Sequence, residues 1–101
     1  MRLRAGQALR SVTDMTAVIV IRAADRDVRV TCGGAPMVEA GSKAGTVPPL
    51  AGHGDGTLLG KRYEDTEATV ELLCTKGGTS SLAIDGVLLT VKAAKPLPAS
   101  D

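Results

Sequence analysis

The stretch SLAIDGVLLTVK, residues 81–92, decides the fold class of this chain. Two apolar-rich runs, 81–84 and 87–92, flank the dipeptide Asp85-Gly86. Asp-Gly between such runs is the strongest short-range signal for a β-hairpin, because the tight turn needs two residues with positive φ. This stretch therefore predicts two antiparallel strands.

Patterns of period two recur through the rest of the chain and extend this interpretation. Residues 16–22 (TAVIVIR) form a β-branched run, and residues 28–32 and 69–74 alternate apolar with polar side chains. Residues 7–11 and 35–38 are shorter strand candidates, and a short helix is considered for residues 64–68. We expect a mostly β fold, a small antiparallel sandwich or barrel of about six to eight short strands.

The length of 101 residues predicts a single domain, which we place at residues 1–94. Residues 39–60 differ from their surroundings because they are rich in glycine and contain Pro48-Pro49. Long segments without strands or helices are uncommon in compact domains, so we expect a flexible loop here. Residues 95–101 are interrupted by prolines and predict an extended C-terminal tail.

The apolar residues predict a core built almost entirely from aliphatic side chains. Tyr63 is the only aromatic residue of the chain. Aromatic side chains usually provide the largest single burials, so this core offers modest stability. Self-association is one way to supplement a small core, and we therefore expect a homo-oligomer or a protein partner.

Charge and hydropathy exclude some partners and indicate a compartment. Twelve basic and eleven acidic residues leave a net charge of +1, which is too balanced for a nucleic-acid-binding protein. The arginines near the start, Arg2, Arg4 and Arg10, are interpreted as solvated.

The apolar run at 17–21 is too short for a signal peptide or a membrane span, so no membrane partner is expected. Two cysteines without an export signal favour the cytoplasm, and the abundance of residues with GC-rich codons favours a bacterial source.

Cys32 and Cys74 are the first candidate site. Each lies in phase with the apolar face of its strand, which predicts two buried core residues. There are two alternatives: a disulfide between the two cysteines on neighbouring strands, and a thiol or metal site that also uses His53. Each cysteine precedes a glycine pair (VRVTCGG and VELLCTKGG), so we expect the two cysteines to occupy equivalent places in the fold. Lys76 stands two residues from Cys74 and could lower the pKa of its thiol. Zinc needs about four ligands, so a metal would have to be shared between subunits.

The segment CGGAPM, residues 32–37, resembles the end of the iron-binding segment of the desulforedoxin-type family. That segment closes on cysteine, glycine, a variable residue, proline and methionine. The family's C-x-x-C pair and its doubled cysteine are missing from this chain. No iron ligand is therefore carried over from the resemblance.

The glycine-rich segment 52–62 (GHGDGTLLGKR) is the second candidate site. A phosphate-binding loop would need glycine where Asp55 stands and a hydroxyl residue in place of Arg62, and the dinucleotide fingerprint fails at Leu59. Lys61 and Arg62 remain as anion-binding candidates. His53 could act as a general acid–base residue only beside a nucleophile, and the sequence contains no nucleophile elbow of the G-x-S-x-G type.

These observations favour a non-enzymatic accessory or interaction module that uses an exposed edge or its central loop, without a cofactor. The alternative is a small-ligand, thiol or metal-binding protein that uses the two cysteines, in one chain or at a subunit interface.

Overall fold

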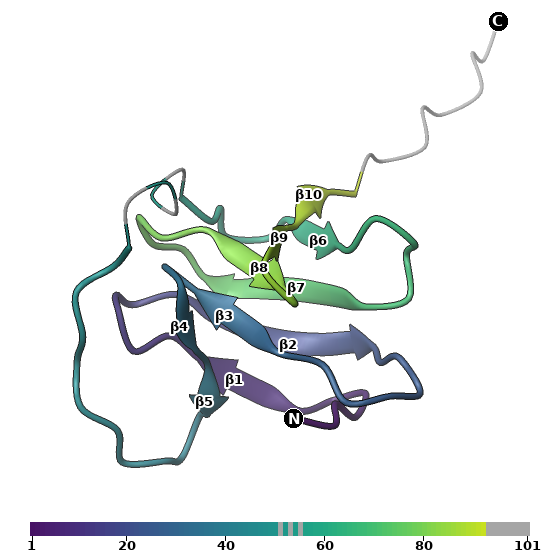
Figure 1. Ribbon diagram of the computed structural model, residues 1–101, viewed down its shortest axis with the longest axis horizontal. Coiled ribbons are helices and arrows are strands. Elements are labelled where there is room, and N and C mark those ends of the chain that lie inside the picture. Colours follow the sequence, from purple (N-terminus) through teal and green to yellow (C-terminus); the bar gives the residue numbers. More distant parts are fainter. Residues whose placement is uncertain (51, 53, 55, 93–101) are drawn as a thin grey trace, which may run out of the picture.

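The computed structural model describes residues 1–50, 52, 54 and 56–92 and shows an all-β protein (Figure 1). The described residues form ten strands and no helix. The strands are β1 (Ala8–Arg10), β2 (Ala17–Arg22), β3 (Val30–Cys32), β4 (Ala35–Pro36), β5 (Val38–Glu39), β6 (Arg62–Glu64), β7 (Glu71–Lys76), β8 (Leu82–Ile84), β9 (Val87–Leu88) and β10 (Thr90–Val91). The prediction of a mostly β fold is confirmed.

The strands form two sheets in which every pairing is antiparallel. The six-stranded sheet has the order β10-β6-β7-β2-β1-β5, and the four-stranded sheet has the order β4-β3-β8-β9. Neither sheet closes on itself, so the described residues do not form a barrel. Ten strands exceed the expected six to eight because β4, β5, β9 and β10 are two-residue segments that sequence patterns do not resolve.

One hydrophobic core draws on both sheets. The six-stranded sheet contributes buried side chains at alternating positions, such as Val18 and Val20 on β2, and the four-stranded sheet contributes Val30 and Ile84. Cys32 and Cys74 also belong to this core, as their phase in the strands predicts. Alternation places these side chains on the shared inner faces, because successive residues of a strand point to opposite sides.

The second half of the chain repeats the strand arrangement of the first half. In each half two strands pair in the six-stranded sheet, the next two pair in the four-stranded sheet, and the last returns to the first sheet. The registers also agree. Leu9 opposes Val18 on one side and Glu39 on the other, and Tyr63 opposes Leu72 and Val91 in the same way. The order of strands in both sheets is therefore symmetric about the centre.

The turns repeat as well. Gly6 and Gly60 both have positive φ, and their N–H groups donate to the carbonyls of Val20 (2.7 Å) and Cys74 (2.9 Å). The β3–β4 and β8–β9 turns, Gly33-Gly34 and Asp85-Gly86, have positive φ at both residues, as a two-residue hairpin turn of this kind requires. The hairpin predicted at Asp85-Gly86 is therefore confirmed.

This repeat corrects one prediction about the cysteines. The shared turn contacts make Val20 the structural counterpart of Cys74. Cys32 opposes Ala35 across its turn, and Ile84 opposes Val87, so Ile84 is the counterpart of Cys32. The two cysteines therefore do not occupy equivalent places, and the resemblance between their flanking sequences is not the repeat that the backbone follows.

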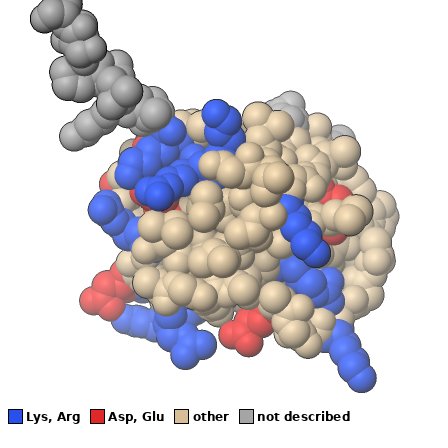
Figure 2. Space-filling model, turned by 180° about the vertical axis from the view of Figure 1, so that it is seen from behind, with Lys and Arg blue, Asp and Glu red and all other residues tan. Residues whose placement is uncertain are grey.

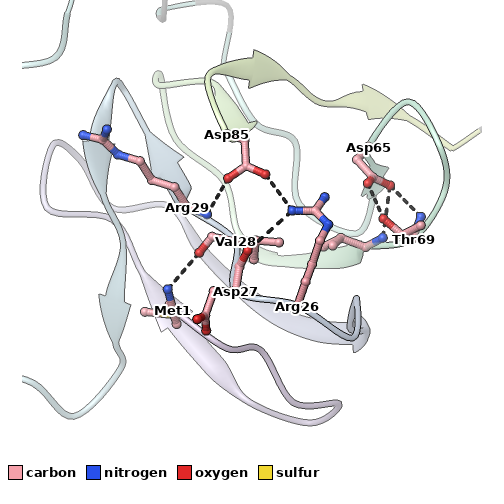
Figure 3. Close-up of polar contacts among 9 residues, drawn as sticks. Met1, Arg26, Asp27, Val28, Arg29, Asp65, Thr69 and Asp85 are labelled. Carbon is pink, nitrogen blue, oxygen red and sulfur yellow. Dashed lines mark hydrogen bonds and ion pairs between the residues drawn. The ribbon is translucent and has the colours of Figure 1, made fainter.

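The helix considered for residues 64–68 is wrong. Glu64 ends β6, and a turn connects this strand to β7. The Asp65 carboxylate accepts hydrogen bonds from the N–H groups of Thr69 (2.7 Å; Figure 3) and Val70 (3.0 Å). Ala68 adopts a φ of 57°. An aspartate that binds the backbone of its own turn competes with helix formation, which explains the difference.

The segment predicted to be a loop, residues 39–60, follows directly on β5. Its described residues beyond Glu39 contain no strand, only the isolated bridge between Thr57 and Gly78. The N–H of Val47 donates to the carbonyl of Val12 (2.9 Å), and that of Leu50 to Gly33 (2.8 Å). The predicted tail 95–101 lies outside the described residues. Over the part of the chain that is described, no helix has the length and apolar character needed to cross a membrane.

Candidate functional site

The two cysteines are buried free thiols in the core. The Cys74 thiol donates to the backbone carbonyl of Lys76 (3.1 Å), and Cys32 Sγ lies 4.0 Å from an oxygen of Asp14. Burial raises the pKa of Cys32 to about 11 and also raises the pKa of Cys74. The net lowering considered for the Cys74 pKa is not found, because burial raises this pKa by more than the backbone contact with Lys76 lowers it. Both thiols are thus protonated at neutral pH, which disfavours nucleophilic chemistry.

Next to Cys32 lies a group of polar side chains that sequence reasoning did not identify as a site. We call it the Asp14 cluster; its members are Ser11, Thr13, Asp14, Thr16 and Ser80. The carboxylate of Asp14 accepts hydrogen bonds from the Thr16 N–H (3.0 Å), the Thr16 hydroxyl (2.9 Å) and the Ser80 N–H (2.9 Å). The Thr13 hydroxyl bridges those of Ser11 and Ser80, at 2.9 Å from each. The cluster thereby joins the β1–β2 turn to the segment that leads into β8.

The Asp14 cluster is closely packed. A Cβ added to Gly78 would lie 2.2 Å from both Oδ2 of Asp14 and Oγ1 of Thr16, and one added to Gly33 would lie 2.5 Å from Oγ1 of Thr13. Burial raises the pKa of Asp14, but the hydrogen bonds from Ser80 and Thr16 together outweigh it, so the net pKa lies below 3.8. The donors to this carboxylate belong to two segments far apart in the sequence, so the arrangement ties these segments together.

The structure does not bring the cysteines into a metal site within the described residues. No three side chains of His, Cys, Asp or Glu converge there. His53 and its neighbour Asp55 lie outside the described residues. The shared site between subunits that the sequence analysis considered therefore stays a prediction.

The anion-binding candidates Lys61 and Arg62 have different surroundings. Arg62 pairs with Glu71 (3.3 Å), which is 95% buried and also pairs with Lys92 (2.8 Å). The hydrogen bond from Lys92 is the main cause that lowers the pKa of Glu71, and Arg62 and Arg22 add to it. We call Arg22, Arg62 and Lys92 the basic cluster. Three cations thus act on one carboxylate. Figure 2 shows Lys and Arg side chains gathered on part of the face opposite to that seen in Figure 1. Lys61 is exposed.

An apolar cavity of about 300 Å³ lies where β6, β9 and β10 meet. We call it the β10 groove; it is lined by Gly56, Leu58, Tyr63, Ser81, Leu82, Leu88, Leu89 and Val91. Leu58 and Val91 also belong to the exposed large apolar side chains, as do Leu59, Val87 and Leu88. The tyrosine hydroxyl accepts a hydrogen bond from the Leu58 N–H (2.9 Å), which fixes one wall of the groove.

The sequence analysis missed the β10 groove, although one signal was present. Residues 87–89 are three consecutive apolar residues (VLL) in a strand that should alternate, and Leu58-Leu59 sit in a glycine-rich segment. Runs of exposed apolar residues are unusual unless they serve contact with a partner.

No protein family model, no curated protein and no solved structure matches this chain. The fold and the candidate sites define it as an all-β protein with two open antiparallel sheets. A partly buried, hydrogen-bonded polar cluster joins the β1–β2 turn to the segment before β8, and an apolar groove lies at one edge.

Proposed function

We propose that this chain is a non-enzymatic interaction module, a small β-sandwich that docks a protein partner through the β10 groove. We further propose that it acts in the cytoplasm of a bacterium, on the grounds of its composition and its two thiols. The observation that carries the proposal is the exposure of three large apolar side chains that line the groove, Leu58, Leu88 and Val91. A contiguous apolar patch with a polar rim is typical of protein interaction sites.

Self-association is part of this proposal, because the small aliphatic core favours added burial in an oligomer. Analytical ultracentrifugation at increasing protein concentration measures this directly.

A peptide-display selection with the full chain as bait tests the proposal without assuming the partner's sequence. The Leu88→Asp variant places a charge in the groove, and Pro36→Asp is the matched control because Pro36 has the corresponding register position on β4. We expect the wild-type chain and the control to enrich a common set of peptides and Leu88→Asp to enrich none. If the wild-type chain enriches nothing and sediments as a monomer throughout, the proposal is wrong.

A further inference from the structure

The internal repeat allows the β10 groove to be compared with the corresponding edge of the first half. Leu88 on β9 corresponds to Pro36 on β4, and Val91 on β10 corresponds to Glu39 on β5. The same backbone arrangement therefore carries apolar side chains at one edge and a proline and a carboxylate at the other. Since the first half forms these strands without exposed apolar residues, the fold itself does not require them at β9 and β10.

Among the described strands, β10 lies at a sheet edge, where backbone groups can pair with an added strand. It ends the six-stranded sheet, and β6 is its only neighbour among the described strands. The Lys92 N–H donates to the carbonyl of Arg62 (2.7 Å), so by antiparallel alternation the N–H and C=O of Val91 face away from β6. An extended segment can pair with such an edge through its main chain.

The two faces at this edge differ in chemistry. Val91 and Tyr63 oppose each other and line the β10 groove on the inner face. Arg62 and Lys92 are adjacent in sequence to these residues, so their side chains lie on the outer face, where they surround Glu71. A strand added beside β10 would present alternate residues to the apolar groove and to the basic cluster.

We propose that the β10 groove binds an extended segment of a partner protein in which apolar residues alternate with acidic ones. This rests on the proposed function and specifies its partner. The apolar side chains enter the groove, and the carboxylates face Lys92 and Arg62. A second copy is a poorer occupant, because pairing two β10 strands about a two-fold axis brings two basic clusters together.

Fluorescence anisotropy with two labelled peptides of about seven residues tests the charge pattern. In one peptide Glu alternates with Val and Leu, and in the other Lys replaces every Glu. We expect the full chain to bind the acidic peptide, with affinity that falls as salt is added, and not to bind the basic one. Equal binding of both peptides, or binding of neither, would overturn the inference.

Two variants locate the contact. Lys92→Gln should weaken binding of the acidic peptide about fivefold, as expected for one partly exposed charge pair. Glu39→Gln is the matched control at the corresponding edge and should leave the affinity unchanged. Circular dichroism of both variants verifies the fold. If Lys92→Gln binds as tightly as the wild type, the contact is not at this edge.

The display selection separates this inference from the proposed function. Selected peptides that lack acidic residues, yet are lost with Leu88→Asp, would leave the interaction module standing and overturn the partner chemistry. If the chain dimerises through the groove and excludes the acidic peptide, the interaction module also stands and the partner chemistry is overturned.

Discussion

Replacing Asp14 with asparagine tests whether the Asp14 cluster holds the β1–β2 turn to the segment before β8. Asparagine has nearly the same shape, but it keeps only one acceptor oxygen and adds a donor. At least one of the three donors that now bind the carboxylate then loses its acceptor. Thr16 and Ser80 are almost fully buried, so water cannot replace the lost bond.

The expected loss follows from these bonds. A buried donor without an acceptor costs about 1–3 kcal/mol, and a hydrogen bond to a charged group contributes about 1.5–3 kcal/mol. We therefore expect Asp14→Asn to lower the free energy of unfolding by about 2–3 kcal/mol. The free energy of unfolding of a domain of this size is about 5–15 kcal/mol. With a urea dependence of about 1 kcal/mol per molar, the unfolding midpoint should fall by roughly 2–3 M.

Urea unfolding followed by circular dichroism measures this loss, with Asp25→Asn as the control. Asp25 is 99% exposed and pairs with Arg2 at the surface, so its replacement should change stability by less than about 0.5 kcal/mol. Equal midpoints for the two variants would refute the role assigned to the Asp14 cluster.

The pH dependence gives a second readout of the same prediction. The pKa of Asp14 in the folded chain lies below its ordinary value of 3.8. Its stabilising contribution is therefore present above pH 3.8 and is lost as the pH falls through the folded pKa. The difference in stability between the wild type and Asp14→Asn should be largest near pH 7 and should shrink in strong acid.

Two further predictions concern packing. Gly78→Ala should destabilise the chain by about 1–3 kcal/mol in urea unfolding, because the new Cβ collides with Asp14 and Thr16. Gly41→Ala is the control and should have little effect, because its Cβ meets no atom within 4 Å. Equal unfolding midpoints for the two variants would contradict this packing. The two buried thiols should react with a thiol reagent far more slowly in the native chain than in denaturant, and rapid native reaction at either one would show an accessible site instead of a core residue.

Much of the fold was predictable because local rules and burial agreed. The Asp85-Gly86 turn and the alternation around Val18 and Cys74 gave strands at the observed places. β6 was missed because Tyr63 is its only apolar residue, between Arg62 and Glu64, and a three-residue strand with one buried side chain has too little pattern.

The repeat was misaligned for a similar reason. The two halves share backbone register but few side chains, and the matching cysteine–glycine patterns stand at different places in the repeat. Only the pairing of strands shows that Cys32 corresponds to Ile84. Sequence similarity within one chain was therefore a poorer guide than the turn glycines Gly6 and Gly60.

The candidate sites depended on tertiary contacts that no single segment contains. The contacts of Thr13 and Asp14 with Ser80 join residues far apart in the chain. Likewise, the sequence indicated Arg62 as an anion-binding candidate, but it did not show that the buried Glu71 and the distant Lys92 lie beside it.

The most direct test of the docking surface is a map of amide chemical shifts during titration with the acidic–apolar peptide. We expect the largest changes at Leu58, Leu88 and Val91 around the β10 groove, and none at Glu39, which holds the place of Val91 in the first half. Changes of equal size at both edges, or changes confined to residues far from the groove, would contradict the assignment of this edge as the docking site.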